Sequence, residues 1–428
     1  MQKVLIIAYY WPPAGGPGVQ RWLKFVKYLG DYNIEPIVYV PENPTYPITD
    51  TSLLNDIPDT VRVLKQPIFE PYGLASIFSK KKTRRISSGI IQKKKKQSLL
   101  ERTLLWLRGN LFIPDARKYW VKPSIKYLSK YIEDEKINTV ITTGPPHSIH
   151  LIGLGLKQRL NLEWITDFRD PWTSIGYHKK LKLSSVAQKK HKKLEGLVLN
   201  TADKIIVTSS TTKKEFSALT QKPIKVITNG YDEELPKCNL DDKFTISHIG
   251  SLLTDRNPEK LWKVLAELVD EKVAFKDHLQ IQLVGLVGKE VIAAITKNGL
   301  SSFTKELGYI SHDEVVQLQP KSQVLLLLEI DSQETKGIIP GKLFEYLNAK
   351  RPILAIGPKD WEAAKIVKET NSGIGLVAND EIALKNVLLE WFKLFQKGAL
   401  VSNSSGIEKY SRKELTNQLA NFIRWESS

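Results

Sequence analysis

Cysteine is nearly absent from this sequence, since Cys238 is the only one among 428 residues. An internal disulfide is therefore excluded, as is a metal site built on several cysteines, and a reducing compartment is indicated. Long apolar runs are also lacking, because no stretch reaches the roughly 18 residues that a membrane-spanning helix needs. The first apolar run, residues 3–8, is short and soon meets proline, which indicates a first strand rather than a signal peptide. We expect a cytoplasmic protein that associates peripherally with the plasma membrane.

Positive charge is unevenly distributed along a chain whose formal net charge is +17. Residues 80–122 hold fourteen Lys or Arg against two acids, a local net charge of +12. Basic clusters at 80–85 and 93–96 precede a segment with the spacing of an amphipathic helix, Leu99 to Phe112. This combination favours an anionic membrane surface, at about 1 kcal/mol per basic residue near the lipid. A solvated loop followed by a core-facing helix is the alternative. Without a nucleic-acid reader motif, we expect no nucleic-acid partner.

The length predicts two domains of about 200 residues each. In the first half, apolar strands alternate with helices, which is typical of a doubly wound α/β sheet whose ligands bind at strand C-termini. The glycine turn at Gly15 and Gly16 follows the first strand and is predicted to face a cleft. Strands are expected at 3–8, 36–40, 139–142, 164–166, 204–207 and 226–227, and helices at 19–29, 122–135, 148–160, 184–200 and 211–219.

A second α/β series follows a polar segment. We expect an N-terminal domain at 1–232 with a basic insert at about 68–125, a linker at 233–243, and a C-terminal domain at 244–410. Residues 411–428 are predicted to form a further helix. Two such halves place a ligand cleft between their sheets. The second half is expected to contain strands at 244–249, 279–284, 324–328 and 352–356, and helices at 257–271, 312–318, 341–348 and 359–369.

The stretch Lys336 to Ile356 has the local pattern of an anion- and ribose-binding corner. Pro340 suits the first turn of a helix, and Gly337 and Gly341 let the backbone approach a ligand closely. A helix N-terminus attracts anions, and Glu345, about one turn in, is placed to accept both hydroxyls of a ribose. The local pattern is equally compatible with a plain helix-to-strand connection that carries one exposed glutamate.

Several other polar residues stand at predicted strand ends. Asp167, Arg169 and Asp170 follow one strand, so at least one should face the cleft. An Arg–Asp ion pair that only shapes the loop is the alternative. His248 precedes Gly250 at another strand end, where a core histidine and a cleft residue are equally compatible with the sequence.

Six motifs in order make the chain resemble the retaining nucleotide-sugar glycosyltransferases of the GT-B fold. The resemblance is to glycosyltransferase family 4, in particular its bacterial branch that works on cell-surface polysaccharide and lipopolysaccharide. It implies two Rossmann-like domains facing a central cleft and a C-terminal helix that crosses back to the N-terminal domain. The motifs are Gly15-Gly16, GPPH at 144–147, DFRDPW at 167–172, VITNGYD at 226–232, HIGSL at 248–252 with Arg256, and GKLFEYL at 341–347.

The resemblance also implies roles for residues. Glu345 matches the second Glu of the family's E-x7-E motif, which holds the ribose, and Arg256 matches the basic residue that neutralises the donor diphosphate. His147 matches a histidine near the transferred sugar, and Asp170 is our preferred acceptor base or orienter. Gly250, Gly341 and Lys342 complete the implied donor site, and Gly15, Gly16, Asp167, Arg169 and Asn229 the implied acceptor side. No metal or other cofactor is expected, because cations can neutralise the leaving diphosphate.

Two departures from the family pattern concern the donor. The first Glu of E-x7-E is replaced by Gly337, and the Arg that usually follows the strand glycine is Ser251. Lys336 or Lys342 is expected to supply compensating diphosphate contacts. Glu329 and Glu334 are near enough in sequence to replace the lost carboxylate.

The predicted function is a metal-independent, retaining glycosyltransferase that moves a sugar from a UDP- or GDP-type donor to a lipid-linked or cell-surface glycan acceptor. Its partners would be a nucleotide sugar, that acceptor, and an anionic membrane surface contacted through residues 80–122. A degenerate GT-B protein that binds glycan or lipid as a scaffold, and a nucleotide-sugar epimerase, are the alternatives. Fold alone does not distinguish them.

Overall fold

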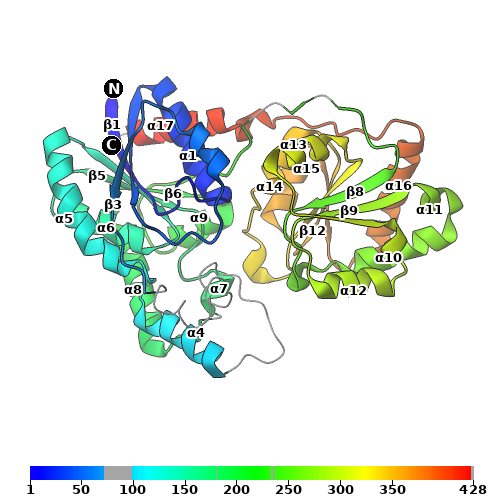
Figure 1. The fold of residues 1–428 in the computed structure, drawn as a ribbon, viewed down its shortest axis with the longest axis horizontal. Helices are drawn as coiled ribbons and strands as arrows, with labels where there is room; N and C mark the ends of the chain where they lie inside the picture. The colour runs from blue at the N-terminus through cyan, green and yellow to red at the C-terminus, as the bar shows by residue number, and fades with distance from the viewer. Residues whose placement is uncertain (72–98, 180, 233–234, 237, 426–428) are drawn as a thin grey trace. The chain divides into compact units, whose positions relative to one another are not determined.

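The computed structural model describes the chain apart from residues 72–98, 180, 233–234, 237 and 426–428. The basic clusters at 80–85 and 93–96 therefore lie outside the described residues. Two compact units are present, one made of residues 1–229 with 412–428 and the other of residues 230–411 (Figure 1). Each contains a parallel β-sheet with helices on both faces, which confirms the predicted fold class of two doubly wound sheets.

The sheet of unit 1 has seven parallel strands in the order β3-β2-β1-β4-β5-β6-β7. Alternate residues of a strand serve opposite faces, so Leu5 and Ile7 of the first strand enter one core while Val4 and Ile6 enter the other. This two-sided burial explains why the central strands are continuous apolar runs. The strands are β1 (Gln2–Ile7), β2 (Ile34–Pro41), β3 (Arg62–Gln66), β4 (Thr139–Gly144), β5 (Glu163–Phe168), β6 (Lys204–Val207) and β7 (Ile224–Val226).

One face of this sheet is covered by helices α1 (Pro17–Leu29) and α17 (Arg412–Arg424), which lie side by side (Figure 1). Leu415, Leu419 and Ile423 of α17 are buried in the same cluster as Trp22 of α1. These three residues recur every fourth position, so they form one apolar stripe on the helix. Burying that stripe brings the C-terminal helix back onto the first unit, as predicted.

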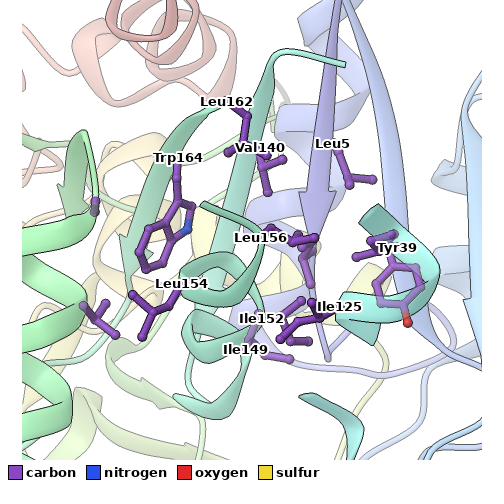
Figure 2. Packing of buried hydrophobic residues seen from close by; sticks show 14 of the residues in the cluster. Leu5, Tyr39, Ile125, Val140, Ile149, Ile152, Leu154, Leu156, Leu162 and Trp164 are labelled. Atoms are coloured by element: carbon purple, nitrogen blue, oxygen red, sulfur yellow. The ribbon is translucent and has the colours of Figure 1, made fainter. Parts of the chain in front are cut away.

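The opposite face of the sheet is covered by α5 (Lys118–Glu135), α6 (Ser148–Lys157) and α8 (Ser185–Thr201). Figure 2 shows Ile149, Ile152 and Leu156 of α6 beside Leu5 of β1 and Val140 of β4. A buried Leu or Ile side chain contributes about 1.5–3 kcal/mol relative to an exposed one. This packing holds the N-terminus of α6 at the end of β4.

The sheet of unit 2 has six parallel strands in the order β10-β9-β8-β11-β12-β13. They are β8 (Phe244–Ile249), β9 (Leu279–Val284), β10 (Thr304–Gly308), β11 (Val324–Leu328), β12 (Ile353–Gly357) and β13 (Gly373–Val377). One face carries α10 (Glu259–Glu271), α11 (Val273–His278), α12 (Lys289–Lys297) and α16 (Glu381–Gln396), and the other carries α13 (His312–Lys321), α14 (Lys342–Ala349) and α15 (Glu362–Glu369).

The predicted series omitted strands β3, β10 and β13, and each of them lies at the edge of its sheet. Edge strands have one side open to water, and β10 accordingly reads TKELG with most of its residues exposed. Such a strand lacks the continuous apolar run that identifies a central strand in the sequence. The prediction also omitted α12 and α16, although Leu384, Leu388 and Phe392 of α16 have a plain helical spacing.

Candidate active site

The ends of three neighbouring strands in unit 2 form an edge lined with glycine. Gly250 follows β8, Gly285 follows β9 and Gly308 ends β10, with φ values of 113°, 101° and 65°. The N–H of Gly285 donates to the carbonyl of Gly308 at 2.6 Å. A Cβ at Gly285 would come within 3.0 Å of the Gly250 carbonyl carbon. The glycines therefore let these backbone segments pack closely together, at the end of a parallel sheet where ligands bind.

Helix α14 begins beside this edge and is fixed there by two side chains. The backbone N–H of Ile249, the last residue of β8, donates to Tyr346 Oη at 3.0 Å. The indole N–H of Trp361 donates to the carbonyl of Ile338 at 2.7 Å and so holds the loop that leads into the helix. The opposite end of α14 is closed by Lys350 in a left-handed conformation, followed by Pro352.

Lys342, the first residue of α14, lies against the glycine edge. A Cβ at Gly250 would be 2.7 Å from Lys342 Nζ, so this approach requires glycine. The same Nζ lies 3.4 Å from His248 Nε2. His248 must donate through Nδ1–H, because that nitrogen faces the carbonyl oxygen of Leu326 at 2.9 Å, so its Nε2 lone pair points at the lysine. Burial, with Lys342 nearby, keeps the pKa of His248 well below its usual range.

The Lys342 amine ends a half-buried side chain and is an unpaired cation among the described residues. It forms no ion pair with a carboxylate in the part of the chain that the structure describes. Burial, together with the nearby Arg256 guanidinium, lowers the pKa of Lys342 to about 8, and Glu345 and Glu329 offset part of this shift. An incoming anion would raise the pKa of this amine and so favour its charged form.

Arg256 and Glu329 form a two-pronged ion pair. Arg256 Nε and Nη2 donate to the two carboxylate oxygens of Glu329 at 2.9 and 3.1 Å. The Glu329 side chain is fully buried and also accepts the N–H of Ile330, whereas the Arg256 side chain is 35% exposed. Glu329 thus holds Arg256 in place through both of its carboxylate oxygens. That Glu329 or Glu334 replaces the sugar-binding carboxylate lost at Gly337 stays a prediction.

The remaining predicted donor residues are placed as follows. Glu345 is half-buried and accepts a hydrogen bond from Gln319 Nε2 of α13 at 3.0 Å, a partner that the sequence did not point to. Gly341 is the residue before α14, with a helical φ of −56°. Lys336 pairs with Asp360 at 3.7 Å. Of the two lysines considered for the diphosphate, Lys342 is therefore the one that reaches the glycine edge.

In unit 1, Arg169 holds the loop that follows β4. Its backbone N–H and its Nε both donate to the carbonyl of Gly144, at 3.0 and 3.3 Å, and its Nη2 donates to the carbonyl of Pro145. Nη1 fills the space where a Cβ at Gly18 would lie. Arg169 therefore shapes the GPPH loop, and Gly18 is a residue that the sequence analysis did not single out.

His147 ends that loop at the N-terminus of α6. Its ring stacks on the indole of Trp172, with 4.9 Å between centroids and planes 3° apart. The side chain is buried, and neither ring nitrogen has a hydrogen-bond partner among the described residues. Burial, reinforced by His150 and His178, keeps the pKa of His147 well below its ordinary value. His147 is thus a neutral imidazole whose plane is set by Trp172.

Three further histidines surround this pair. His150 Nδ1 lies 2.9 Å from Thr142 Oγ1, the indole N–H of Trp172 donates to His191 Nδ1 at 3.2 Å, and the rings of His178 and His191 meet edge to face at 4.5 Å. Burial lowers the pKa of His150 to about 3 and that of His178 to about 4. In the described part of the chain, no group of three or more His, Cys, Asp or Glu is placed to hold a metal ion.

The two aspartates of the DFRDPW motif have different surroundings. Asp167 is fully buried and accepts hydrogen bonds from Arg21 Nη2 at 2.9 Å, Trp22 Nε1 at 2.7 Å and Thr143 Oγ1 at 2.8 Å. It therefore serves the interior of the unit and not a ligand-facing surface. Asp170 is half-buried, and burial raises the pKa of its carboxyl while Arg169 opposes the shift.

Gly15, Gly16 and Asn229 complete the predicted acceptor residues. Gly15 N–H donates to the carbonyl of Ile48 at 3.0 Å, and Gly16, with φ of 104°, precedes α1. Asn229 is half-buried. Beside it, the carbonyl of Thr228 accepts from Arg21 Nη1 at 2.6 Å, so the Asp167–Arg21 pair also fixes the segment before Asn229.

Helix α4 (Leu99–Leu111) confirms the amphipathic helix expected after the basic clusters. It packs through Gly109 against Leu183, while Trp106 and Leu111 are exposed. Phe69 and Tyr119 are also exposed, and their rings meet edge to face at 5.7 Å. No helix in the described ranges is long and apolar enough to cross a membrane.

Comparisons with known proteins agree with this architecture. Residues 90–235 match the family model of Glycosyltransferase Family 4. The sequence search finds no match among the curated proteins.

Solved structures share the fold over almost the whole chain. Sucrose-phosphate synthase from Thermosynechococcus elongatus is 14% identical with a TM-score of 0.59, covering 99% of this chain and 98% of its own. Anabaena HepE, in complex with UDP-glucose, is 15% identical with a TM-score of 0.61 and 99% of both chains covered. A TarM variant from S. aureus, in complex with fondaparinux, alpha-GlcNAc-glycerol and UDP, is 12% identical with a TM-score of 0.59, covering 99% of this chain and 100% of its own.

These findings confirm the resemblance to glycosyltransferase family 4, and the architecture is the GT-B fold. The family domain and the fold together support a glycosyltransferase.

Proposed function

We propose that this chain is a metal-independent, retaining glycosyltransferase that moves a sugar from a UDP- or GDP-type donor to a lipid-linked or cell-surface glycan acceptor. The observation that carries the donor assignment is the Lys342 amine. It is a half-buried cation with no carboxylate ion pair among the described residues, and it stands over the glycine edge at the end of β8. A partly desolvated charge of this kind is stabilised by an opposite charge, and a nucleoside diphosphate supplies one.

The surroundings of Lys342 suit a diphosphate that leaves with increasing negative charge. The N–H groups at the start of α14 point the same way as the helix dipole, which favours anions. Arg256, fixed by Glu329, supplies a second cation whose guanidinium is partly exposed. Cations held in place before the reaction lower the barrier, because they need no rearrangement as the charge develops. In this proposal, they take the role that a metal ion has in other sugar transferases.

Glu345 is assigned to the ribose of the donor. Gln319 donates to Oε2 of this carboxylate, which leaves Oε1 to accept from a ribose hydroxyl. Because Gly337 replaces the sugar-binding glutamate, the donor sugar must be held by other groups. HepE and TarM, which share the fold, are seen with UDP-glucose and with UDP and glycans, and this supports a nucleotide sugar and a glycan as the substrates here.

The acceptor is assigned to unit 1. The neutral ring of His147 offers a lone pair and an N–H to a sugar hydroxyl or to a developing oxocarbenium charge. The raised pKa of Asp170 makes this carboxylate a better proton acceptor than an ordinary aspartate. The exposed aromatic residues near α4, together with the basic clusters before it, are assigned to an anionic inner-leaflet surface, where the acceptor lipid would be anchored.

Isothermal titration with UDP, GDP, ADP and CDP tests the donor assignment. We expect one or more to bind, with at least tenfold weaker binding to Glu345→Ala. Failure of every nucleotide to bind the natural protein would overturn the assignment.

Release of sugar from the matching donor distinguishes an enzyme from a binding scaffold, and the anomeric configuration of the product tests retention. Flotation with liposomes tests the membrane contact, since equal recovery with and without anionic lipid would contradict it.

A further inference from the structure

A groove of about 520 Å³ lies on unit 1, and none of its lining residues has been assigned a role above. Helix α5 forms most of its wall, and Gln66 at the end of β3 closes one side. The size is within the range of small-molecule sites, which is roughly 300–1,000 Å³. The groove is therefore large enough for one or two sugar rings.

Two neighbouring stripes of α5 line this groove, each with a residue at every fourth position. Pro123 and the aromatic Tyr127 and Tyr131 form one stripe, and Lys126 and Lys130 begin a charged stripe that ends at Asp134. Residues four apart lie on one face of a helix, so both stripes face the groove along its length. Ring faces and charged groups thus run side by side over about two turns of helix.

The tyrosines belong to a longer stack of rings that makes a rigid platform. Trp120 stacks on Tyr39 at 4.9 Å with planes 8° apart, Tyr39 lies 6.0 Å from Tyr127 at 22°, and Tyr127 lies 6.3 Å from Tyr131 at 14°. Trp120 and Tyr39 are buried, whereas Tyr127 is 40% exposed. A surface ring backed by buried rings loses little freedom when a ligand stacks on it.

Polar groups beside the stacked rings remain available to bind a ligand. Tyr39 Oη donates to Gln66 Oε1, which sets the amide so that its NH2 group remains available to the groove. Lys126 and Lys130 form no ion pair with a carboxylate among the described residues. The carboxylate of Asp134 is a hydrogen-bond acceptor at the far end.

We propose that this groove is a second carbohydrate-binding site, which holds an extended glycan bearing acidic groups. The C–H face of a pyranose carries partial positive charge and stacks on the negative face of a tyrosine ring. The two free ammonium groups match carboxylates or phosphates on the glycan, and the amide of Gln66 and the carboxylate of Asp134 match its hydroxyls.

A single-stranded nucleic acid also uses ring stacking and lysines, but it fits these observations less well. The sequence has no recognisable nucleic-acid reader motif, and the thymidine hexanucleotide in the experiment below tests this alternative. The proposal does not depend on the donor site, because none of the groove residues is assigned to nucleotide binding.

Binding is measured by titration calorimetry with a hyaluronan hexasaccharide, maltohexaose and a thymidine hexanucleotide. We expect the natural protein to bind hyaluronan more tightly than maltohexaose, and Tyr127→Ala to weaken both at least fivefold. Tyr127→Phe keeps the ring and should retain binding. The double change Lys126→Gln with Lys130→Gln should bring the affinity for hyaluronan down to that for maltohexaose.

Tyr309→Ala is the control, because Tyr309 is an exposed tyrosine of unit 2 outside the groove. Thermal unfolding and UDP titration of each variant show whether the fold and the donor site are intact. Absence of binding to both glycans, equal loss with Tyr309→Ala, or tighter binding of the oligonucleotide would each overturn the proposal. A protein that binds glycan but no nucleotide would contradict only the proposed function.

Discussion

Neutral histidines gather beyond β4 and β5 in unit 1, whereas cations gather beyond β8 in unit 2. Both groups stand at the carboxyl ends of parallel strands, but the histidines are buried, whereas Lys342 is half-buried and the Arg256 side chain is 35% exposed. In unit 1 the buried side chains of Asp167 and Glu70 each pair with a buried arginine, Arg21 and Arg117, and the histidine rings are neutral. In unit 2 the half-buried Lys342 has no carboxylate ion pair among the described residues.

This difference shows that the burial of a charged side chain does not by itself indicate a ligand-binding site. The Asp167–Arg21 pair organises its own unit, because the Asp167 carboxylate already accepts three hydrogen bonds from residues of that unit. A cation without an ion pair is stabilised when an anion binds beside it. The contrast can be tested by removing one charge at a time.

The largest effect is expected for Asp167→Asn. The change leaves the buried Arg21 guanidinium without its counter-ion, so we expect a loss of about 3–5 kcal/mol in the free energy of unfolding. Lys3→Met is the control, because the partly exposed Lys3–Glu135 pair should contribute no more than about 1 kcal/mol. Urea unfolding measures both. A loss below that of the control would mean that Asp167 is not the organising charge of unit 1.

Lys342→Met should have the opposite effects, with little change in the free energy of unfolding and a large loss of nucleotide affinity. Loss of a charged hydrogen-bond donor costs about 1.5–3 kcal/mol, or about 10- to 150-fold in nucleotide affinity. Calorimetry with the nucleoside diphosphate measures it, with the free nucleoside as the ligand that should be unaffected. Lys336→Met is the matched control, and an equal loss there would contradict the special position of Lys342.

Acid should destabilise unit 1 through its neutral histidines. The folded pKa of His178 is about 4, below the ordinary 6.5, so the unfolded chain binds more protons and stability falls as the pH drops from about 6.5 toward 4. At about 1.4 kcal/mol per pH unit, this one group should lower stability by about 2 kcal/mol at pH 5. His178→Asn should remove that part of the pH dependence, and His278→Asn in unit 2 should not. Parallel pH curves for the natural protein and His178→Asn would contradict the assignment.

The smallest effect is expected in the pH dependence of nucleotide binding. Because the pKa of Lys342 is about 8 without ligand, its charged fraction falls between pH 7 and pH 9, and affinity should fall about tenfold over that range. Lys342→Arg stays charged and should flatten the curve. A flat curve for the natural protein would show that the amine does not contact the diphosphate.

The sequence predicted the central strands better than the edges. β6, β8, β9 and β11 were located at their observed bounds, because burial on both faces demands an unbroken apolar run. The omitted strands β3, β10 and β13 all lie at sheet edges, where water replaces one neighbour and polar residues are tolerated. In the site, the sequence pointed to Lys342, Glu345 and His147 through their motifs. It assigned no role to Trp172 or Gln319, whose contacts with His147 and Glu345 depend on the tertiary structure.

By itself, the sequence determined the α/β class, the amphipathic α4 and Gly250 after its strand, because these depend on local period and on residue type. The tertiary structure alone decided which charges are matched. Glu329 and Asp167 are carboxylates at strand ends like Asp170, yet each is taken by an arginine distant in sequence, Arg256 and Arg21. Whether a charge is available depends on its partners in space, and sequence distance says little about those partners.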